Sequence, residues 1–402
     1  MATLTLSSGT LQQSSFDKVG DGFRYDKIKL LKGFYIAARP YQLNSGTTIT
    51  SDPGAIITLT AGVSETLFPS MVPIFGQVEN YISDILIENI TFRGNRRSQK
   101  VAHGKGFHNL VGIRGGKNIT IRNVTAGESQ GDIARIVDCE NVLYSGNIIK
   151  ECGHDGLFVE RCVNVEAAGN VTYTRVNSAL RSKGSSNVSF HDNFIYGTSE
   201  AYSPGIQVEN SKADELSSGI EIWNNHIEGT YGPGIWAACH TSSNIKAASD
   251  LNIHDNVISN CGTMPVENGI PGLGGIVCDG WDRVNIENNI IDSCKGYGVL
   301  FGRYLTTSAG KGYTATVKNN TITNTQKPNS TVATSGTAIA NLIPDKYTIF
   351  VEGNKLSRNV KDYSGVAPAT SAGEYEIVFS CSSREEALAR LEWIKSAFIR
   401  EV

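Results

Sequence analysis

A short phrase recurs along the chain between residues 84 and 354, in the order apolar, polar, apolar, polar, Asn, apolar. It occurs about ten times, and a strand-length pattern that returns at a nearly fixed interval is typical of a solenoid. Its asparagines lie 23 residues apart in the middle of the chain and 31 to 34 apart in many later coils. The pattern predicts an all-β fold: a single-stranded right-handed parallel β-helix of about ten or more coils, with extra loops in the longer coils.

The composition of each phrase supports this fold. Every second residue is apolar, most often Ile or Val, so one side of each strand is expected to be buried in a core that β-branched side chains fill well. We expect the recurrent Asn at the sharp turns between strands, because Asn tolerates left-handed backbone angles and can hydrogen-bond to its neighbours. Stacked coil upon coil, these amides would form an internal ladder.

The two ends of the chain lack the repeat. We therefore predict a lead-in and N-terminal cap over residues 1–45, the β-helix over 46–363 and a C-terminal strand and helix over 364–402. Ser383 and Glu386 have the spacing of a capping box. Apolar residues then return at helical spacing, at Leu388, Leu391, Ile394 and Phe398. We expect this amphipathic helix to cover the last coil; a helix that binds a partner is the alternative.

Charge and hydropathy exclude some classes of partner. The net charge of 402 residues is only −3, so the field of the whole molecule attracts no polyanion, and we expect no nucleic acid. No apolar run approaches the roughly 20 residues of a membrane span. The first six residues show no signal-peptide pattern; either the protein stays inside the cell or the sequence is that of a mature form.

The cysteines point to a buried structural role. Cys139 and Cys162 occupy equivalent positions in successive coils, and stacked buried thiols are favoured because free Cys behaves as a small apolar residue. A bridge between these two residues is the alternative. No pair of closely spaced cysteines and no His-rich tract indicates a metal site, and we predict no cofactor; calcium is conceivable at the acidic residues but has no recognisable loop.

A second set of phrases precedes the Asn phrases and carries the candidate chemistry. Alternation directs one set of side chains inward: Ile113, Leu157, Leu180, Ile206, Ile235 and Ile276. It predicts an outward row of Arg114, Arg135, Phe158, Arg181, Gln207 and Trp236. A second outward row, two residues further on, contains Glu160, Lys183, Glu209 and Asp279. A later phrase ends at Arg303, which we add to the candidate binding residues.

These rows predict a cleft for an acidic polysaccharide. Neighbouring coils lie about 4.8 Å apart, so the rows extend over several sugar units. Arginine binds carboxylates in bidentate geometry, and the rings of Phe158 and Trp236 provide flat faces for a sugar. The alternative is a surface covered with ion pairs, in which Glu160 pairs with Arg181 or Lys183.

His154 and Asp155 precede one of these strands, in the turn Gly-His-Asp-Gly. Histidine titrates near neutral pH, so a His–Asp pair can act as an acid or a base. Asp-Gly is also a favourable turn in its own right. We include both residues in the candidate site.

Several motifs resemble the archaeal disaggregatase family. They are the run Gly-Lys-Gly-Phe-His-Asn-Leu at 104–110, the turn at residues 153–156, the run Gly-Gly-Ile-Val-Cys-Asp-Gly-Trp-Asp at 274–282, and the phrases at 288–291 and 296–298. The similarity covers roughly residues 45–325. The resemblance implies an extracellular or cell-surface enzyme that breaks down the chondroitin-like matrix polysaccharide binding methanogen cells together. That polymer contains uronic acid, which a groove rich in arginine would suit.

Two reactions and one non-catalytic role remain open. Hydrolysis, which we favour, would use Asp155, Glu160, Glu209 or Asp279; Glu160 and Glu209 are two coils, about 10 Å, apart, at the edge of the range for an inverting pair. In β-elimination, Lys183 would take the proton while Arg181 and Arg135 stabilise the charge that develops. A glycan-binding phage fibre is the third reading. We expect a monomer, with a trimer as the alternative.

Overall fold

The computed structural model describes residues 2–12, 15, 18–19, 22–23, 25–62, 74–77, 81–99, 109–173, 177–197, 203–210, 215–239, 248–264, 274–302, 312–327 and 335–366. The chain forms two compact units, residues 1–368 and 369–402. The second unit lies outside the described residues, and so do the predicted C-terminal helix and Arg303. Within the described residues, no helix is long and apolar enough to cross a membrane.

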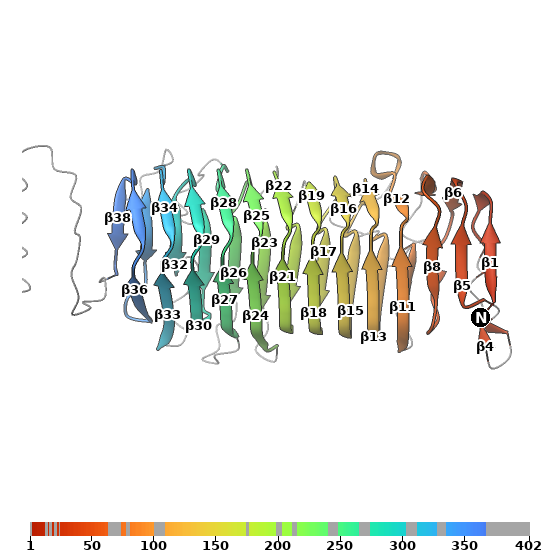
Figure 1. Ribbon diagram of the computed structural model, residues 1–402, viewed down its shortest axis with the longest axis horizontal. Coiled ribbons are helices and arrows are strands. Elements are labelled where there is room, and N and C mark those ends of the chain that lie inside the picture. The colour runs from red at the N-terminus through yellow and green to blue at the C-terminus, as the bar shows by residue number, and fades with distance from the viewer. Residues whose placement is uncertain are drawn as a thin grey trace, which may run out of the picture. The chain divides into compact units, whose positions relative to one another are not determined.

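Parallel strands of the first unit stack coil upon coil in three ladders (Figure 1). The first ladder contains β7 (Tyr41–Gln42), β10 (Phe75–Gln77), β17 (Leu157–Glu160), β20 (Leu180–Lys183), β23 (Ile206–Asn210), β26 (Ile235–Cys239), β29 (Gly274–Asp279), β32 (Tyr297–Phe301), β35 (Thr337–Asn341) and β38 (Lys361–Ser364). The second contains β1 (Thr3–Leu6), β5 (Lys27–Leu30), β8 (Thr48–Ser51), β11 (Ile82–Glu88), β18 (Val163–Ala168), β21 (Ser186–His191), β24 (Ser217–Trp223), β27 (Ala248–His254), β30 (Asp282–Glu287), β33 (Tyr313–Lys318) and β36 (Tyr347–Glu352).

The third ladder is a separate 13-stranded sheet of short strands. It contains β2 (Gly9–Thr10), β6 (Gly33–Ala37), β9 (Ala55–Leu59), β12 (Thr91–Arg93), β14 (Thr125–Gly127), β16 (Ile148–Lys150), β19 (Val171–Tyr173), β22 (Phe194–Tyr196), β25 (His226–Glu228), β28 (Val257–Ser259), β31 (Ile290–Asp292), β34 (Thr321–Thr323) and β37 (Lys355–Ser357). The first two ladders are joined into one 23-stranded sheet by β13 (Val111–Arg122) and β15 (Ala134–Ser145), which run through both. The predicted parallel β-helix is confirmed.

Buried asparagines form the predicted internal ladder. The side chain of Asn193 donates to Oδ1 of Asn225 at 2.9 Å, and its own Oδ1 accepts from the side chain of Asn170 at 2.8 Å. The left-handed angles expected of the recurrent asparagines occur at Asn89 (φ +60°) and Asn123 (φ +53°). In the coils that form the ladder they belong instead to the residue before the buried Asn: Asp192 has φ +56° and Asn224 has φ +53°. Where a phrase reads Asn-Asn, the first residue makes the turn and the second enters the ladder.

The interior between the ladders is apolar. Leu157, Ile235 and Ile276 point inward as predicted and are fully buried, and burial of each such side chain contributes about 1.5–3 kcal/mol. Cys139 and Cys162 are buried free thiols in successive coils, as the sequence indicated.

The ladders continue into the segment predicted as an N-terminal cap. β1 pairs with β5 and β5 with β8, all in parallel, so strands before residue 46 already belong to coils; the antiparallel pair of β3 (Lys18–Val19) and β4 (Gly22–Phe23) lies between them. A 3-10 helix, η2 (Arg96–Ser98), follows β12.

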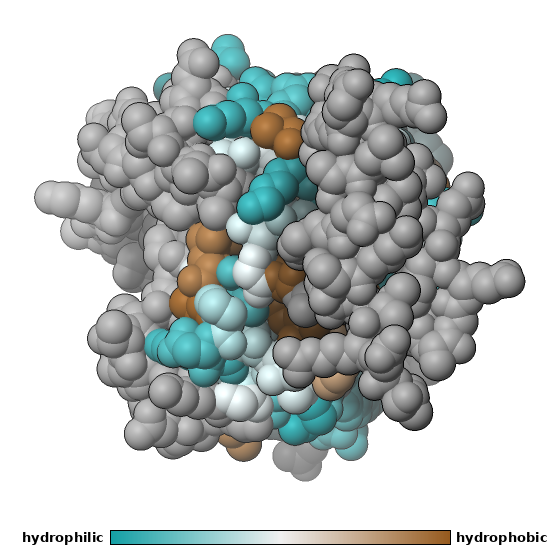
Figure 2. Space-filling model, turned by 90° about the vertical axis from the view of Figure 1, so that its left-hand side faces the viewer, coloured by the Kyte–Doolittle hydropathy of each residue, from teal (hydrophilic) through white to brown (hydrophobic). Residues whose placement is uncertain are grey.

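The last described coil leaves apolar surface. Ile349, Leu356 and Tyr363 are only partly buried against the core, and Figure 2 shows hydrophobic surface at this end of the unit. Solenoid ends need covering, and the helix that we predicted for this role lies outside the described residues.

Candidate functional site

The strand register fixes which candidate residues are neighbours on the outer face of the first ladder. One row, hereafter row 1, runs through Gly112, Arg135, Phe158, Arg181, Gln207, Trp236 and Val277. The next, row 2, runs through Arg114, Val137, Glu160, Lys183, Glu209, Ala238 and Asp279. The placement of Arg114 in row 1 is therefore wrong: Gly112 takes that position, because β13 is two residues out of step with our alignment of the phrases.

The outer face changes character along the ladder. The part formed by β15 to β23 carries charged residues, whereas further on an apolar cluster contains Trp236, Val277, Tyr297 and Leu300. Nε1 of Trp236 donates to Oδ2 of Asp279 at 3.3 Å, so these two predicted residues form a separate contact in the apolar part. The other predicted residues of β15 to β23 come together in one network.

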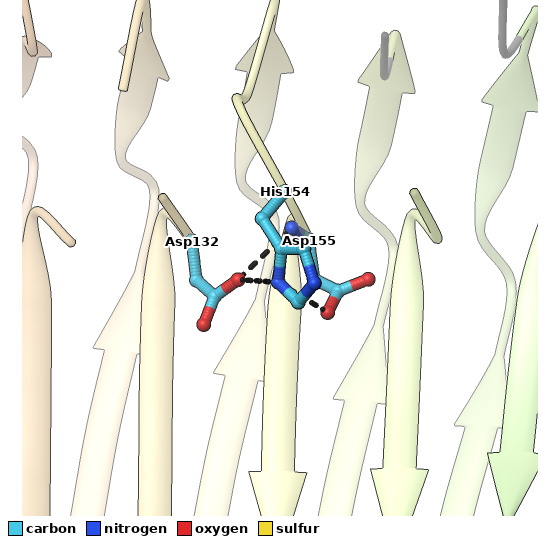
Figure 3. Close-up of side chains that lie close together, drawn as sticks. All are labelled: Asp132, His154 and Asp155. Atoms are coloured by element: carbon cyan, nitrogen blue, oxygen red, sulfur yellow. Dashed lines mark hydrogen bonds and ion pairs between the residues drawn. The ribbon is translucent and has the colours of Figure 1, made fainter. Parts of the chain in front are cut away.

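The centre of this network is a histidine held between two carboxylates (Figure 3). Nδ1 of His154 lies 2.7 Å from Oδ1 of Asp132 and 3.0 Å from Oδ2 of Asp155. Both carboxylates are fully buried, and the imidazole side chain is 20% exposed. Asp132 lies one coil before Asp155, at the same place just before the strand of the first ladder. Its Oδ1 also accepts a hydrogen bond from the backbone N–H of Asp155 at 3.0 Å.

Two arginines enclose an aromatic ring beside this histidine. The guanidinium carbons of Arg135 and Arg181 lie 4.4 and 4.6 Å from the ring centroid of Phe158. Such cation–π contacts contribute about 0.5–2 kcal/mol each. Because row 1 places the three residues in consecutive coils, each arginine stacks on one side of the ring. The faces of Phe158 are therefore occupied, and the prediction that this ring stacks on a sugar does not fit the structure.

Both arginines also bind carboxylates of the protein. Arg135 lies 3.0 Å from Glu160 and 3.6 Å from Asp132. Arg181 lies 2.7 Å from Glu209 and 3.3 Å from Asp155. The predicted alternative of an ion-paired surface thus applies to this part of the ladder. Glu160 pairs with Arg135, with Arg161 at 2.8 Å and, more loosely, with the predicted Lys183, but not with Arg181.

The remaining members of the network are less tightly paired. Lys183 lies 3.7 Å from Glu160 and 3.9 Å from Glu215, at the limit of an ion pair. Gln207 donates from Nε2 to Glu209 at 2.9 Å. Arg114 is exposed, and it makes no ion pair with any described residue. Lys183 and Arg114 are therefore the row 2 cations that are most available to an anionic ligand.

The charges around His154 determine which groups of the site are protonated. Burial by itself lowers the pKa of His154, but the carboxylates of Asp155 and Asp132 outweigh burial and raise this pKa to about 10. Burial raises the pKa of Asp155, yet His154 and Arg181 bring it below the ordinary value. The pKa of Glu160 is lowered because Lys183 and Arg135 outweigh its burial. At neutral pH the site thus holds an imidazolium among carboxylates.

The same three residues are the only group within the described residues with the spacing of metal ligands. Ligand atoms of Asp132, His154 and Asp155 all lie within 4.8 Å of one another. The guanidinium groups of Arg135 and Arg181 adjoin the two carboxylates and would repel a cation. A metal would also need neutral His154, whereas the surroundings favour its protonated form.

Asp132 was missed in the sequence. Its only signal is that it precedes Asp155 by 23 residues, the length of a coil in this region. Asn177, one coil after His154, was missed as well; its amide nitrogen lies 3.2 Å from Nε2 of His154. Neither residue belongs to a local motif.

Two family models match the chain. Residues 217–384 match the model described as disaggregatase related, and residues 77–249 match the right-handed β-helix region. The resemblance to the disaggregatase family is confirmed. The disaggregatase-related segment includes Trp236 and Asp279 but begins after the network around His154, which lies in the β-helix segment. No curated protein matches the sequence.

Solved structures of similar fold span most of this chain. The A-module of mannuronan C-5 epimerase AlgE4 from Azotobacter vinelandii has a TM-score of 0.63 and 16% identity, covering 85% of this chain and 91% of its own. A family 28 exopolygalacturonase from Yersinia enterocolitica has 0.55 and 13%, covering 88% and 71%. The surface protein and adhesin PfbA from Streptococcus pneumoniae has 0.53 and 17%, covering 86% and 92%. At such identities the likeness shows the fold alone.

Proposed function

We propose that this protein is an enzyme that hydrolyses an acidic, uronate-containing matrix polysaccharide. The observation that carries the proposal is His154, a partly exposed imidazolium held between the buried carboxylates of Asp132 and Asp155. A surface ion pair would not require two fully buried acids, and such strongly perturbed groups gather at functional sites.

In this proposal His154 is the proton donor. Its exposed edge can reach the leaving oxygen of a glycosidic bond, which must be protonated as the bond breaks. Asp132 and Asp155 have no exposed surface, so they act as positioning residues that orient the ring and keep it charged. Glu160, ionised and slightly exposed, is the candidate base that takes a proton from the attacking water.

Recognition of uronate falls to row 2. Arg135 and Arg181 already bind carboxylates of the protein, whereas Arg114 and Lys183 are less engaged. These two cations are three coils apart in the register, about 14 Å at the ordinary strand spacing. A polymer lying along the ladder could place separate carboxylates on them, with His154 between.

Comparisons add support of a general kind. The named polymers of two proteins with this fold are mannuronan and polygalacturonate, and the disaggregatase resemblance implies a uronate-containing matrix outside the cell. A surface adhesin also has this fold, so a non-catalytic, glycan-binding role of this protein is the alternative outcome of the test.

The test is incubation with a uronate-containing matrix polysaccharide while reducing ends and ultraviolet absorbance are followed together. We expect reducing ends without absorbance. Both signals together would indicate β-elimination, which forms an unsaturated uronate, and would transfer the role of base to Lys183. Neither signal, with the polymer still bound, would indicate the adhesin-like role.

Two variants connect the activity to the site. His154→Gln should lower kcat at least about 100-fold, the lower range for loss of a general acid, with KM little changed. Arg114→Ala should instead raise KM, more strongly at low salt. The matched control is Arg122→Ala, on the second ladder; an equal effect of the control would remove row 2 from substrate recognition.

A further inference from the structure

The outer face of the third ladder carries an apolar row that the proposed function does not use. The register aligns six residues of consecutive coils: Ile148, Val171, Phe194, His226, Val257 and Ile290. Four of them, Ile148, Phe194, Val257 and Ile290, are between 36 and 49% exposed. At about 4.8 Å per coil the row extends over about 24 Å. Contiguous exposed apolar surface of this kind indicates a partner.

The order of the residues in the row reads the same in both directions. From its centre, between Phe194 and His226, the row shows a ring, then Val, then Ile on each side. The next residues continue the symmetry, since Thr125 precedes Ile148 and Thr321 follows Ile290. In a two-fold interface each residue i that meets j of the other copy is also met by j in return, so a mirrored row places side chains of similar kind against one another.

We propose that this face is the interface of a homodimer in which the coil stacks of two copies run antiparallel. A two-fold axis parallel to the strands, midway between Phe194 and His226, places Phe194 against the partner's His226. The same axis places Val171 against the partner's Val257 and Ile148 against the partner's Ile290. Because both copies repeat at the strand spacing, the rows stay in step along their whole length.

Charges beside the row fit the same axis. The neighbouring outward row begins with Lys150 and ends with Asp292, in the coils of Ile148 and Ile290. The axis brings Lys150 opposite the partner's Asp292, and Tyr196 opposite the partner's Glu228, a phenol that can donate to a carboxylate. Opposite charges meet twice in the dimer, so the arrangement is complementary as well as apolar.

Two other occupants fit less well. A three-fold assembly would bring this row against a different surface, so the match of the row with its own mirrored order would play no part. A sugar chain would stack on exposed rings, but three of the four most exposed residues of the row are aliphatic, and the adjacent Tyr173 and Tyr196 lie stacked on each other, with centroids 5.2 Å apart and planes 19° apart. The aliphatic residues of the row suit another protein face. The sequence led us to expect a monomer, and this face argues for two copies.

Light scattering of the full chain tests the proposal. We expect twice the 43.3 kDa of one chain, and a dimer dissociation constant at least tenfold weaker for Phe194→Asp. The control is Phe34→Asp, in the same row but beyond the mirrored segment and 70% exposed, which should leave the dimer intact. A mass of one chain or of three chains at every concentration would overturn the proposal. So would a monomeric protein in which Phe194→Asp abolishes polysaccharide binding, because the row would then bind the substrate.

Two further variants test the orientation. Lys150→Glu should weaken the dimer, and adding Asp292→Lys in the same chain should restore it. Val171→Cys and Val257→Cys together should give a covalent dimer on oxidation, because within one chain they are three coils, about 14 Å, apart, beyond the roughly 7 Å limit between Cα atoms of a disulfide. Absence of both the rescue and the cross-link in a protein that is still dimeric would exclude this axis.

Discussion

Arg181 joins carboxylates of two different coils: its Nη1 lies 3.3 Å from Oδ2 of Asp155, and its Nη2 lies 2.7 Å from Oε1 of Glu209. Arg135 does the same for Asp132 and Glu160. The charged part of the first ladder is therefore connected across coils by guanidinium groups, and its acids depend on these groups for their charge balance.

Replacement of Arg181 should destabilise the fold. In Arg181→Ala, Asp155 and Glu209 remain buried without their cation, and breaking a buried pair in this way costs about 3–5 kcal/mol. Urea denaturation measures the change in the free energy of unfolding. Arg122→Ala is the control: its partner Glu88 forms an exposed pair on the second ladder, and the expected change is below about 1 kcal/mol. Equal losses in both variants would mean that burial of the network contributes nothing to the free energy of unfolding.

The pH dependence of stability should show the charge on His154. Its pKa in the fold, about 10, is above the ordinary 6.5, so the folded state holds the proton more tightly than the unfolded chain does. The resulting stabilisation is complete below about pH 6.5 and disappears as the pH rises towards 10. The difference in unfolding free energy between wild type and His154→Gln should shrink over this range. An imidazole that titrates near 6.5 by NMR would contradict the prediction.

The buried asparagine ladder should be far more sensitive than exposed asparagines. Asn193→Ala removes a side chain that donates to the carbonyl of Ala167 and to Asn225, leaving buried polar groups without partners at about 1–3 kcal/mol each. Asn187→Gly is the control, since Asn187 is exposed with φ +52°, where glycine fits without strain. Thermal unfolding should show a loss of at least about 2 kcal/mol in the first variant and little change in the second.

Gly234 should not tolerate a side chain. A Cβ there would lie 2.6 Å from Cγ2 of Ile258 and 2.8 Å from the carbonyl oxygen of Gly275. Backbone of the next coil cannot move aside, so Gly234→Ala should cost about 1–3 kcal/mol. Adding Ile258→Val should not restore the lost stability, because valine keeps the Cγ2 methyl group that makes the close contact. An unchanged midpoint in urea would show that the coils can separate at this position.

The sequence predicted the solenoid correctly because few other folds repeat a strand pattern at a nearly fixed interval. It also predicted that most of the candidate residues share the outer face of the first ladder, and the register places them there. Arg114 was assigned to row 1 because Gly112-Ile113 resembles the Gly-apolar start of the later phrases, whereas the register pairs Gly112 with Arg135 and Phe158, two residues beyond that start.

What the sequence determined by itself is the class of fold, the inward residues and the stack of asparagines, since these follow from local alternation and period. The tertiary structure decided which side chains meet. Asp132 reaches His154 only because one coil brings residues 22 positions apart to the same edge. The pairing of Arg135 with Glu160, and the mirrored row from Ile148 to Ile290, likewise depend on contacts between coils, which no single strand encodes.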